Sequence, residues 1–325
     1  MERLDVGDFA RGFGISENEM PPECAKLIGS MDFRYRVLNG KDRDEVILGI
    51  IKTLNTELPM SGPNRLAAWE EGWSENLRAF VQSGFKLEAL LPFYNRRGKK
   101  VMRWKGEYIL PTSLDFEANF LAVLKIWLVK MHFEGVEHVY EFGCGPAHHL
   151  AAFAQIYPEK LYHGLDWAPA SQEIIKHLAA SQEANITGHR FDMFSPDGTV
   201  HIEPNAAVIT MDSMEQLGEH YRPFLDYLLA ESPKRCIHIE PLYELYDVSG
   251  LPDYLAERYS MKRGYLRGFL PALRELERAG QIVIHDVRKI LGSLYQDGWS
   301  LVTWTPVGRS EASTGSETGR AGPKS

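Results

Sequence analysis

The stretch VYEFGCGPAHHL combines an acid, two glycines and two histidines at spacings that several kinds of functional site use. Cys144 resembles a nucleophile at a turn, but a nucleophile turn has glycines two residues away on each side, and here Gly143 and Gly145 flank it directly. His148 and His149 are unsuited to bind one metal ion, because neighbouring residues of a helix point about 100° apart. Glycines in such a turn let a ligand approach the backbone, so the stretch predicts a small-molecule binding loop.

Acidic residues end three of the short apolar runs that read as strands. Glu141 lies at the end of HVYE, two residues before the first glycine, Asp166 ends LYHGLD, and Asp192 lies in HRFDMF. Ligands of open α/β sheets bind beyond the carboxyl ends of the strands, so we expect these acids at one site. At such a site the second acid accepts hydrogen bonds from a ribose. The third lies where an adenine amino group is usually read.

The elements that must position these residues alternate between strand and helix from residue 136 onward. Strand-like runs include ITGHRFDM, AAVITMD, RCIHIEP and QIVIHDV, and helical stretches separate most of them, which predicts a mostly parallel sheet with helices on both faces. Upstream, apolar residues recur at helical spacing and alternating patterns are scarce. The predicted organisation is a helical region (1–97), a linker or hairpin (98–113), an α/β domain (114–307) and a disordered tail (308–325). The helical region is expected to shape the binding site for the compound that is modified, the acceptor, and to form a lid over it.

The ordered set of motifs resembles the class I S-adenosylmethionine-dependent methyltransferases. Residues 141–147, EFGCGPA, look like the first motif of that family, and Asp166, Asp192 and the run 214–216, MEQ, follow in the family's order. The resemblance covers about residues 114–306, and candidate sixth and seventh strands end the chain as in that family. The combination of EFGCG, GLDWAPAS, FDMF, EQLG and IEPLYELYD is similar to bacterial sugar O-methyltransferases.

The resemblance implies an α/β fold: a seven-stranded, mostly parallel, doubly wound Rossmann-like methyltransferase sheet with an N-terminal helical domain. It also implies S-adenosylmethionine as the cofactor, with Glu141 near the methionine amino group, Asp166 on the ribose and Asp192 on the adenine amine. A nicotinamide enzyme would usually have a third glycine, where this chain has His148. The expected cofactor-binding residues are Glu141, Gly143, Gly145, Asp166, Trp167, Asp192, Met193 and Met211.

The acceptor site is expected among polar residues that follow the fourth and fifth strands, because a hydroxyl acceptor needs alignment and a base. Glu240 is the preferred base, since period-two alternation and chain order place it facing the acceptor. The candidate catalytic residues are Glu240, His220, Glu215 and Tyr243. The candidate substrate-binding residues are Gln216, Glu244, Arg263 and Arg267. Asp212, Glu240 and Glu244 could together bind a metal ion, but their spacing does not demand one, and we expect none.

Two further groups have both a structural and a functional interpretation. Arg263 and Arg267 are spaced four residues apart in a long helical stretch, so they form either a solvated basic face or a clamp for an anionic substrate. Aromatic residues of the N-terminal region are mostly core, and they are also suited to cover the donor and acceptor pocket. These aromatic residues are Trp69, Trp73, Phe80, Phe85, Phe93 and Tyr94.

Composition narrows the partners. The chain has 325 residues, a formal net charge of −8 and a pI near 5.8, which argues against a phosphate-binding surface for nucleic acids. Its three cysteines are far apart, so a reducing cytoplasm is expected. Residues 120–131 contain two lysines and are too short to span a membrane.

Together these patterns predict O-methylation of a sugar or another small hydroxylated metabolite. N-methylation of an amide or amine, such as a peptide side chain, and a catalytically silent donor-binding partner protein are the alternatives. The sequence leaves the oligomeric state open.

Overall fold

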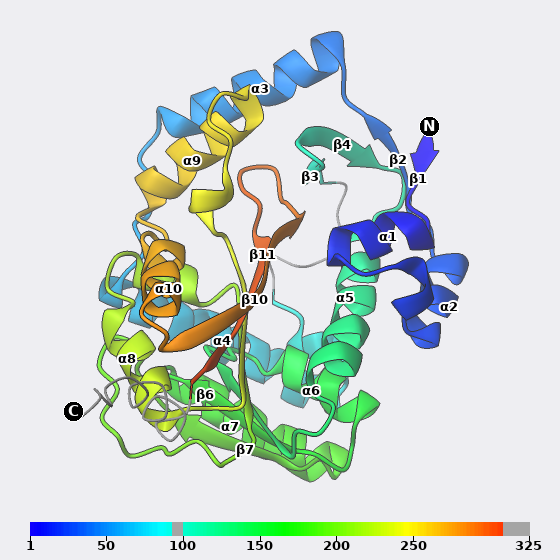
Figure 1. Cartoon of the computed structure of the whole chain (residues 1–325). Coiled ribbons are helices and arrows are strands. Elements are labelled where there is room, and N and C mark those ends of the chain that lie inside the picture. Colours follow the sequence, from blue (N-terminus) through cyan, green and yellow to red (C-terminus); the bar gives the residue numbers. More distant parts are fainter. Residues whose placement is uncertain (93–99, 308–325) are drawn as a thin grey trace, which may run out of the picture.

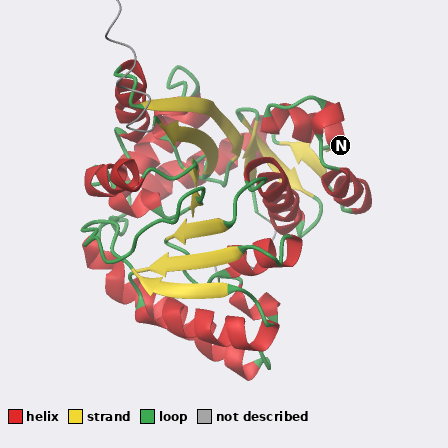
Figure 2. Ribbon diagram, turned by 60° about the horizontal axis from the view of Figure 1, so that its bottom comes forward, coloured by secondary structure: helices red, strands yellow, loops and turns green. Residues whose placement is uncertain are grey.

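A seven-stranded sheet flanked by helices organises the computed structural model, which describes residues 1–92 and 100–307 (Figures 1 and 2). The strands are, in spatial order, β10 (Ile282–Leu291), β11 (Trp299–Pro306), β9 (Arg235–Glu240), β8 (Ala207–Met211), β5 (His138–Phe142), β6 (Leu161–Asp166) and β7 (Ile186–Arg190). Strands β5 to β9 are parallel, whereas β11 runs antiparallel to both of its neighbours. Numbered along the chain from β5, the spatial order is 3-2-1-4-5-7-6. This order confirms the predicted class I methyltransferase fold.

Helices cover both faces of this sheet. On one face α5 (Phe116–His132), α6 (His148–Ile156) and α7 (Pro169–Gln182) pack in a common core with Val139 and Ile209. On the other face α8 (Arg222–Glu231) and α10 (Phe269–Arg278) pack against Tyr140 and Val208. Adjacent residues of a strand point to opposite faces, so the buried strands carry apolar residues at nearly every position. This packing fixes the carboxyl ends of β5, β6 and β8 beside one another.

The N-terminal region contains helices and part of a second sheet. Its helices are α1 (Val6–Phe13), α2 (Pro22–Ser30), α3 (Gly40–Leu54) and α4 (Leu66–Gln82). The second sheet has four strands in the order β1 (Glu2–Arg3), β2 (Arg34–Val37), β4 (Glu107–Pro111) and β3 (Met102–Trp104). Strands β1 and β2 were not anticipated, because runs of two and four residues are too short to show alternation.

Strands β3 and β4 form a hairpin whose two turn residues, Lys105 and Gly106, have φ values of 51° and 80°. Positive φ at both turn residues matches the right-handed twist of the strands. The first two residues of the predicted linker or hairpin, the predicted tail 308–325, and Phe93 and Tyr94 lie outside the described residues.

The N-terminal helices share their core with the large sheet. Phe9 stacks on Phe120 with ring centroids 4.7 Å apart, and Phe13 stacks on Trp127 at 4.4 Å. Both partners belong to α5, which itself lies on the sheet. Burying such aromatic pairs ties the N-terminal region to the α/β core.

A network of buried charges also joins distant parts of the chain. The guanidinium of Arg103 in β3, which is 1% exposed, pairs with Asp253 of α9 (Leu251–Arg263) and lies 3.3 Å from the carboxylate of Asp297. Lys289 of β10 lies 2.8 Å from Asp253 and 3.5 Å from Asp297. A buried charge is tolerated when it is paired in this way.

The helical stretch predicted to carry Arg263 and Arg267 together is divided in the structure. Helix α9 ends at Arg263, and Gly264 follows with φ 65°. Helix α10 begins after Gly268, which has φ 86°. Glycine readily adopts this left-handed conformation, so the chain turns between the helices. The two arginines therefore do not share a helix face, and their predicted pairing is wrong.

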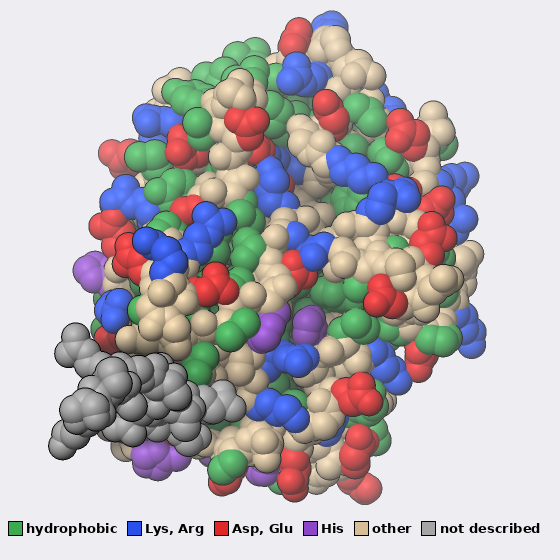
Figure 3. Space-filling view, viewed as in Figure 1, with side chains coloured by type: hydrophobic (Ala, Val, Ile, Leu, Met, Phe, Trp, Pro, Cys, Tyr) green, Lys and Arg blue, Asp and Glu red, His purple; other side chains and the backbone are tan. Residues whose placement is uncertain are grey.

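The molecular surface mixes charges. On the face in Figure 3, basic and acidic side chains are interspersed, and apolar side chains gather at the top, over α3 and α9. Exposed apolar side chains there include Leu48 and Ile51 of α3 and Met261 of α9. No helix within the described ranges is long and apolar enough to cross a membrane.

Candidate active site

The glycine turn after β5 brings three sequence segments into close contact. Gly143 and Gly145 have φ values of 70° and 51°, a conformation that glycine adopts without strain. A Cβ atom on Gly143 would lie 2.3 Å from Cβ of Ser213, and one on Gly145 would lie 2.9 Å from the ring of Trp73. Ala147 also has a positive φ, 57°, at a cost of about 1 kcal/mol. The turn therefore needs glycine both for its backbone conformation and for its neighbours.

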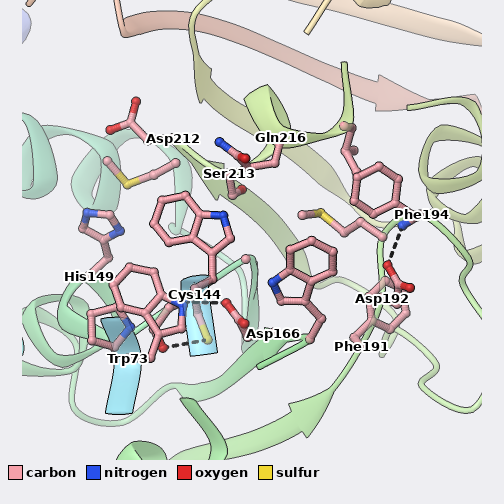
Figure 4. A pocket seen from close by; sticks show the side chains of 18 of the residues that line it. Trp73, Cys144, His149, Asp166, Phe191, Asp192, Phe194, Asp212, Ser213 and Gln216 are labelled. Atoms are coloured by element: carbon pink, nitrogen blue, oxygen red, sulfur yellow. Dashed lines mark hydrogen bonds between the residues drawn. The ribbon is translucent and has the colours of Figure 1, made fainter. Parts of the chain in front are cut away.

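A first cavity, which we call the donor cavity, opens beside this turn. Asp166, Asp192 and Asp212 contribute carboxylates to its wall, and none of the described residues that line it is Lys or Arg. Figure 4 shows Asp192 at one end and His149 and Asp212 at the other, with Asp166 between them. A cavity with several carboxylates and no basic side chain favours a cationic ligand over a phosphate.

Asp166 lies where β6 ends and is 5% exposed. Its Oδ2 accepts a hydrogen bond from the N–H of Gly145, and its Oδ1 accepts one from the N–H of Ala168, both at 2.8 Å. Burial raises the pKa of Asp166 to about 6, against these two N–H donors, which favour the ionised form. Asp166 thus fixes the glycine turn and also lines the donor cavity.

Aromatic side chains line the Asp192 end of the donor cavity. The rings of Trp167 and Phe194 stack with centroids 5.6 Å apart, and Met193 lies beside them in the wall. Oδ1 of Asp192 accepts a hydrogen bond from the N–H of Phe194 at 2.9 Å (Figure 4). The flat faces and the carboxylate suit a planar heteroaromatic ring that carries an amino group.

Glu141 lies behind the wall of the donor cavity, and His149 lies in the wall. Oε1 of Glu141 is 2.7 Å from Nδ1 of His149, and the carboxyl group is 1% exposed. Burial raises the pKa of Glu141 to about 8, although Lys125 partly opposes this, and burial lowers the pKa of His149 well below its ordinary value. Burial thus favours the uncharged form of each partner, and Nδ1 of His149 is engaged by Glu141, which leaves Nε2 for the cavity. Glu141 therefore does not line the cavity itself, and its predicted place beside the methionine amino group is taken by His149. Sequence reasoning missed His149 because it tested the two histidines only as metal ligands.

A second cavity, which we call the acceptor cavity, adjoins the first and has a volume of about 780 Å³. The two cavities share Trp69, Asp212 and Gln216 as lining residues. Aliphatic residues and glycines form part of the rest of its wall. The aromatic and charged residues of that wall come from both ends of the chain and are Arg65, Lys100, Glu117, Glu215, Arg263, Tyr265, Tyr295 and Trp299. A cavity this large with aromatic and polar walls fits a hydroxylated ring compound.

Asp212 stands where the two cavities meet, directly after β8. Its φ of 52° is unusual for a residue other than glycine, and such strained positions cluster at functional sites. Oδ2 accepts a hydrogen bond from the indole N–H of Trp299 at 3.0 Å, whereas Oδ1 has no partner among the described residues. Burial raises the pKa of Asp212 well above its ordinary value, and the nearby carboxyl groups of Glu215 and Glu240 raise it further. The sequence drew attention to Asp212 only as a possible metal ligand.

The position of Glu240 corrects its prediction as the base. The side chain is fully buried, and it lines neither of the two cavities. Oε1 accepts a hydrogen bond from the N–H of Ser213 at 3.2 Å, and Oε2 accepts one from the N–H of Glu215 at 3.3 Å. These bonds hold the short helix η5 (Met214–Leu217), so Glu240 positions the loop that carries Asp212. The loop after β8, which contains η5, covers the Glu240 side chain and separates it from the acceptor cavity.

Four other predicted residues lie outside both cavities. His220 is exposed on the surface, and Tyr243 is half-buried away from the cavities. Glu244 accepts a hydrogen bond from the backbone N–H that precedes α10, at 2.5 Å. Arg267 forms a surface ion pair with Glu219. These contacts correct the prediction that these four side chains meet the acceptor.

Three predicted residues do reach the acceptor cavity: Glu215, Gln216 and Arg263. Glu215 accepts hydrogen bonds from the amides of Gln216 at 3.0 Å and Gln296 at 3.3 Å. Of the predicted donor residues, Gly143, Gly145, Asp166, Trp167, Asp192, Met193 and Met211 line the donor cavity. Within residues 1–92 and 100–307, no group of three His, Cys, Asp or Glu side chains could hold a metal ion.

Comparisons with known proteins add the following findings. No protein-family model matches the chain. An undecaprenyl-diphosphatase from Methylacidiphilum infernorum (isolate V4) is 31% identical over 94 residues, which cover 27% of this chain and 35% of that protein. The chain therefore spans about a third of the length of this curated relative.

Among solved structures, the O-methyltransferase NcsB1 from neocarzinostatin biosynthesis, in complex with S-adenosyl-L-homocysteine and 1,4-dihydroxy-2-naphthoic acid, matches with a TM-score of 0.41 and 15% identity. This match covers 59% of this chain and 58% of that chain, which is less than two thirds of its length. An O-methyltransferase family protein from Burkholderia thailandensis matches over 94% of this chain and 89% of its own, at 10% identity and a TM-score of 0.44. The strand order described above is that of the class I methyltransferase fold.

Proposed function

We propose that the chain is a methyltransferase that binds S-adenosylmethionine in the donor cavity and methylates a hydroxyl group in the acceptor cavity. The observation that supports this proposal most directly is that the two cavities meet at Asp212, beyond the carboxyl end of β8. Ligands of open α/β sheets bind at this edge.

The chemistry of the donor cavity fits this cofactor. When bound, S-adenosylmethionine supplies an electrophilic methyl group on a positively charged sulfur. Three carboxylates without Lys or Arg among the described lining residues suit that cation, and they would repel the pyrophosphate of a dinucleotide. In this proposal Asp166 accepts hydrogen bonds from the ribose, and Asp192 reads the adenine amine beside the stacked rings of Trp167 and Phe194. His149, held by Glu141, provides the polar atom nearest the methionine end.

Asp212 is the proposed general base. Methyl transfer to a hydroxyl group requires that the hydroxyl proton leaves as the new carbon–oxygen bond forms. Oδ2 of Asp212 is held by Trp299, so Oδ1 is the atom that takes this proton. Trp69 and Gln216, which border both cavities, position the acceptor beside it. The aromatic walls and hydrogen-bonding groups of the acceptor cavity favour a sugar or a similar hydroxylated metabolite.

Two measurements test this function. Titration calorimetry measures whether S-adenosylmethionine binds, and mass spectrometry measures whether a panel of sugars and peptides gains a methyl group as S-adenosylhomocysteine accumulates. Fragmentation of the product locates the methyl group on oxygen or nitrogen. Methylated nitrogen would support the amide or amine alternative, and donor binding without any methylated product from the panel would support a silent donor-binding protein. A protein that does not bind S-adenosylmethionine would refute the proposal.

A further inference from the structure

We propose that the acceptor carries an anionic group, phosphate or carboxylate, that Arg65 and Arg263 bind together in the acceptor cavity, as well as the hydroxyl group that is methylated. This inference rests on the proposed function, because it names the class of compound that the second cavity accepts.

Arg263 is poised to bind an anion. It is the last residue of α9 and lines the acceptor cavity, with its guanidinium 4.9 Å from the ring centroid of Tyr265 and 6.0 Å from that of Tyr259. Its Nε is buried without a hydrogen-bond partner, and no carboxylate of the described residues forms an ion pair with it. A partly buried guanidinium without a counter-ion is costly, and a bound anion would relieve that cost.

Arg65 has the same properties on a different segment. It ends the 3-10 helix Pro63–Arg65 just before α4, lines the acceptor cavity and stacks over Trp69 at 5.9 Å. Its Nε is also buried without a partner, and within the described part of the chain it forms no ion pair. Two guanidinium groups held by aromatic rings present planar pairs of donors, the geometry that matches carboxylate and phosphate oxygens.

The acidic residues of the same cavity do not serve these arginines as partners. Glu117 pairs with Lys100, and Glu215 accepts its hydrogen bonds from Gln216 and Gln296. Burial raises the pKa of Glu215, whereas the nearby charge of Arg263 lowers it, although the two side chains form no ion pair. Within the described residues neither arginine is therefore committed to an ion pair, which leaves both guanidinium groups available to a bound anion.

Hydrogen-bond acceptors in the cavity indicate what else the ligand carries. The side-chain carbonyl oxygens of Gln216 and Gln296 are both buried and have no donor within the described residues. Buried amide oxygens are normally satisfied, and hydroxyl groups of a ligand would satisfy them. Unpaired donors for an anion and unpaired acceptors for hydroxyl groups in one cavity thus point to a hydroxylated, negatively charged compound such as a sugar phosphate or a sugar acid.

The test uses matched ligands and does not depend on turnover. Titration calorimetry of the full chain with S-adenosylhomocysteine present compares glucose, glucose 1-phosphate, glucose 6-phosphate and glucuronate, which share a ring and differ in charge. At least one anionic compound is expected to bind about tenfold or more tightly than glucose, and added salt should weaken that preference. Binding of the phosphates alone, or of glucuronate alone, identifies which anion the site takes. If no anionic compound binds more tightly than glucose, the inference is wrong.

Variants then assign the preference to the two arginines. Arg65→Gln and Arg263→Gln should each weaken binding of the preferred anion about ten- to a hundredfold. The matched control is Arg267→Gln, because Arg267 pairs with Glu219 at the surface, and its affinity should be unchanged. If Arg263→Gln does not fold, Arg263→Lys replaces it; this variant keeps the charge and should lose part of the affinity for the anionic compound. Arg65→Gln then tests independently whether an arginine binds the anionic group. An anion preference that survives both glutamine variants would overturn the inference. The proposed function fails separately, if the wild-type chain does not bind S-adenosylmethionine. The two tests therefore distinguish failure of this inference from failure of the proposed function.

Discussion

Replacing Asp212 with asparagine removes the proposed base and little else. Asparagine has nearly the same size and tolerates the left-handed φ of 52° found at this position. Its amide oxygen can still accept the indole N–H of Trp299. The variant loses the ability to take a proton and one of the three carboxylates of the donor cavity, and general-base loss typically costs about 10²- to 10⁴-fold in rate at saturating donor. We therefore expect Asp212→Asn to raise the barrier of methyl transfer by about 3 to 5 kcal/mol with donor affinity nearly unchanged.

The assay is single-turnover formation of S-adenosylhomocysteine with saturating donor and the acceptor that the panel of sugars and peptides identifies. The wild-type rate should rise with pH along an acidic limb, because Asp212 acts only when ionised. Since burial raises the pKa of Asp212, that limb should lie above the ordinary carboxylate range of about 4. Trp299→Phe removes the hydrogen bond that favours the ionised carboxylate, so the limb should move to higher pH.

Glu240→Gln is the matched control, since it makes the same chemical change one contact away. Glu240 holds two backbone N–H groups, so its replacement should mainly lower stability, by about 1 to 3 kcal/mol. A variant Asp212→Asn that keeps the full rate, with Glu240→Gln losing a hundredfold or more, would refute the assignment of the base. If neither change matters, the reaction needs no side-chain base, which favours an amine acceptor.

Three further predictions concern the donor cavity. Gly143→Ala should lower the free energy of unfolding by at least about 2 kcal/mol, because its Cβ would lie 2.3 Å from that of Ser213. The control Gly280→Ala has the same φ of 70° in open space and should cost about 1 kcal/mol in urea unfolding, so equal losses would contradict the argument. Asp166→Asn should weaken S-adenosylmethionine binding about ten- to a hundredfold by calorimetry, and an unchanged Kd in a folded variant would exclude the ribose contact. Burial raises the pKa of Glu141 from 4.5 to about 8, so the stability that its protonated form contributes is lost as pH rises through that window. Between pH 5 and pH 8.5 the melting temperature of Glu141→Gln should therefore fall less than that of the wild type. Parallel curves of melting temperature against pH would contradict the raised pKa.

The donor half of the site was largely predictable from sequence, because local patterns determine it. A glycine turn after a strand and acids at strand ends have positions that follow from the order of elements along a parallel sheet. Asp166 and Asp192 accordingly line the donor cavity. Glu141 also ends its strand as expected, but sequence alone does not tell which of two adjacent groups, Glu141 or His149, faces the ligand.

The acceptor half was predicted less well because it depends on contacts between distant segments. Trp69 and Arg65 reach the cavities through the packing of α4 against the α/β domain, which no local pattern encodes. The choice of Glu240 as the base assumed that strand alternation determines access, whereas the loop after β8 turns through a left-handed residue and covers Glu240. Arg267 was misplaced because two glycines end one helix and begin another within a stretch that reads as continuous.

The buried charge network centred on Arg103 implies that the first hundred or so residues are not an exchangeable module. Arg103 comes from the hairpin, whereas Asp253 and Asp297 come from the last quarter of the chain. A chain shortened to residues 114–307 would leave two buried carboxylates opposite Lys289 alone, and removing one partner of a buried ion pair typically costs about 3 to 5 kcal/mol. A chimera of two related chains joined at the hairpin should therefore fold only when both chains carry a basic residue at position 103 and acidic residues at positions 253 and 297.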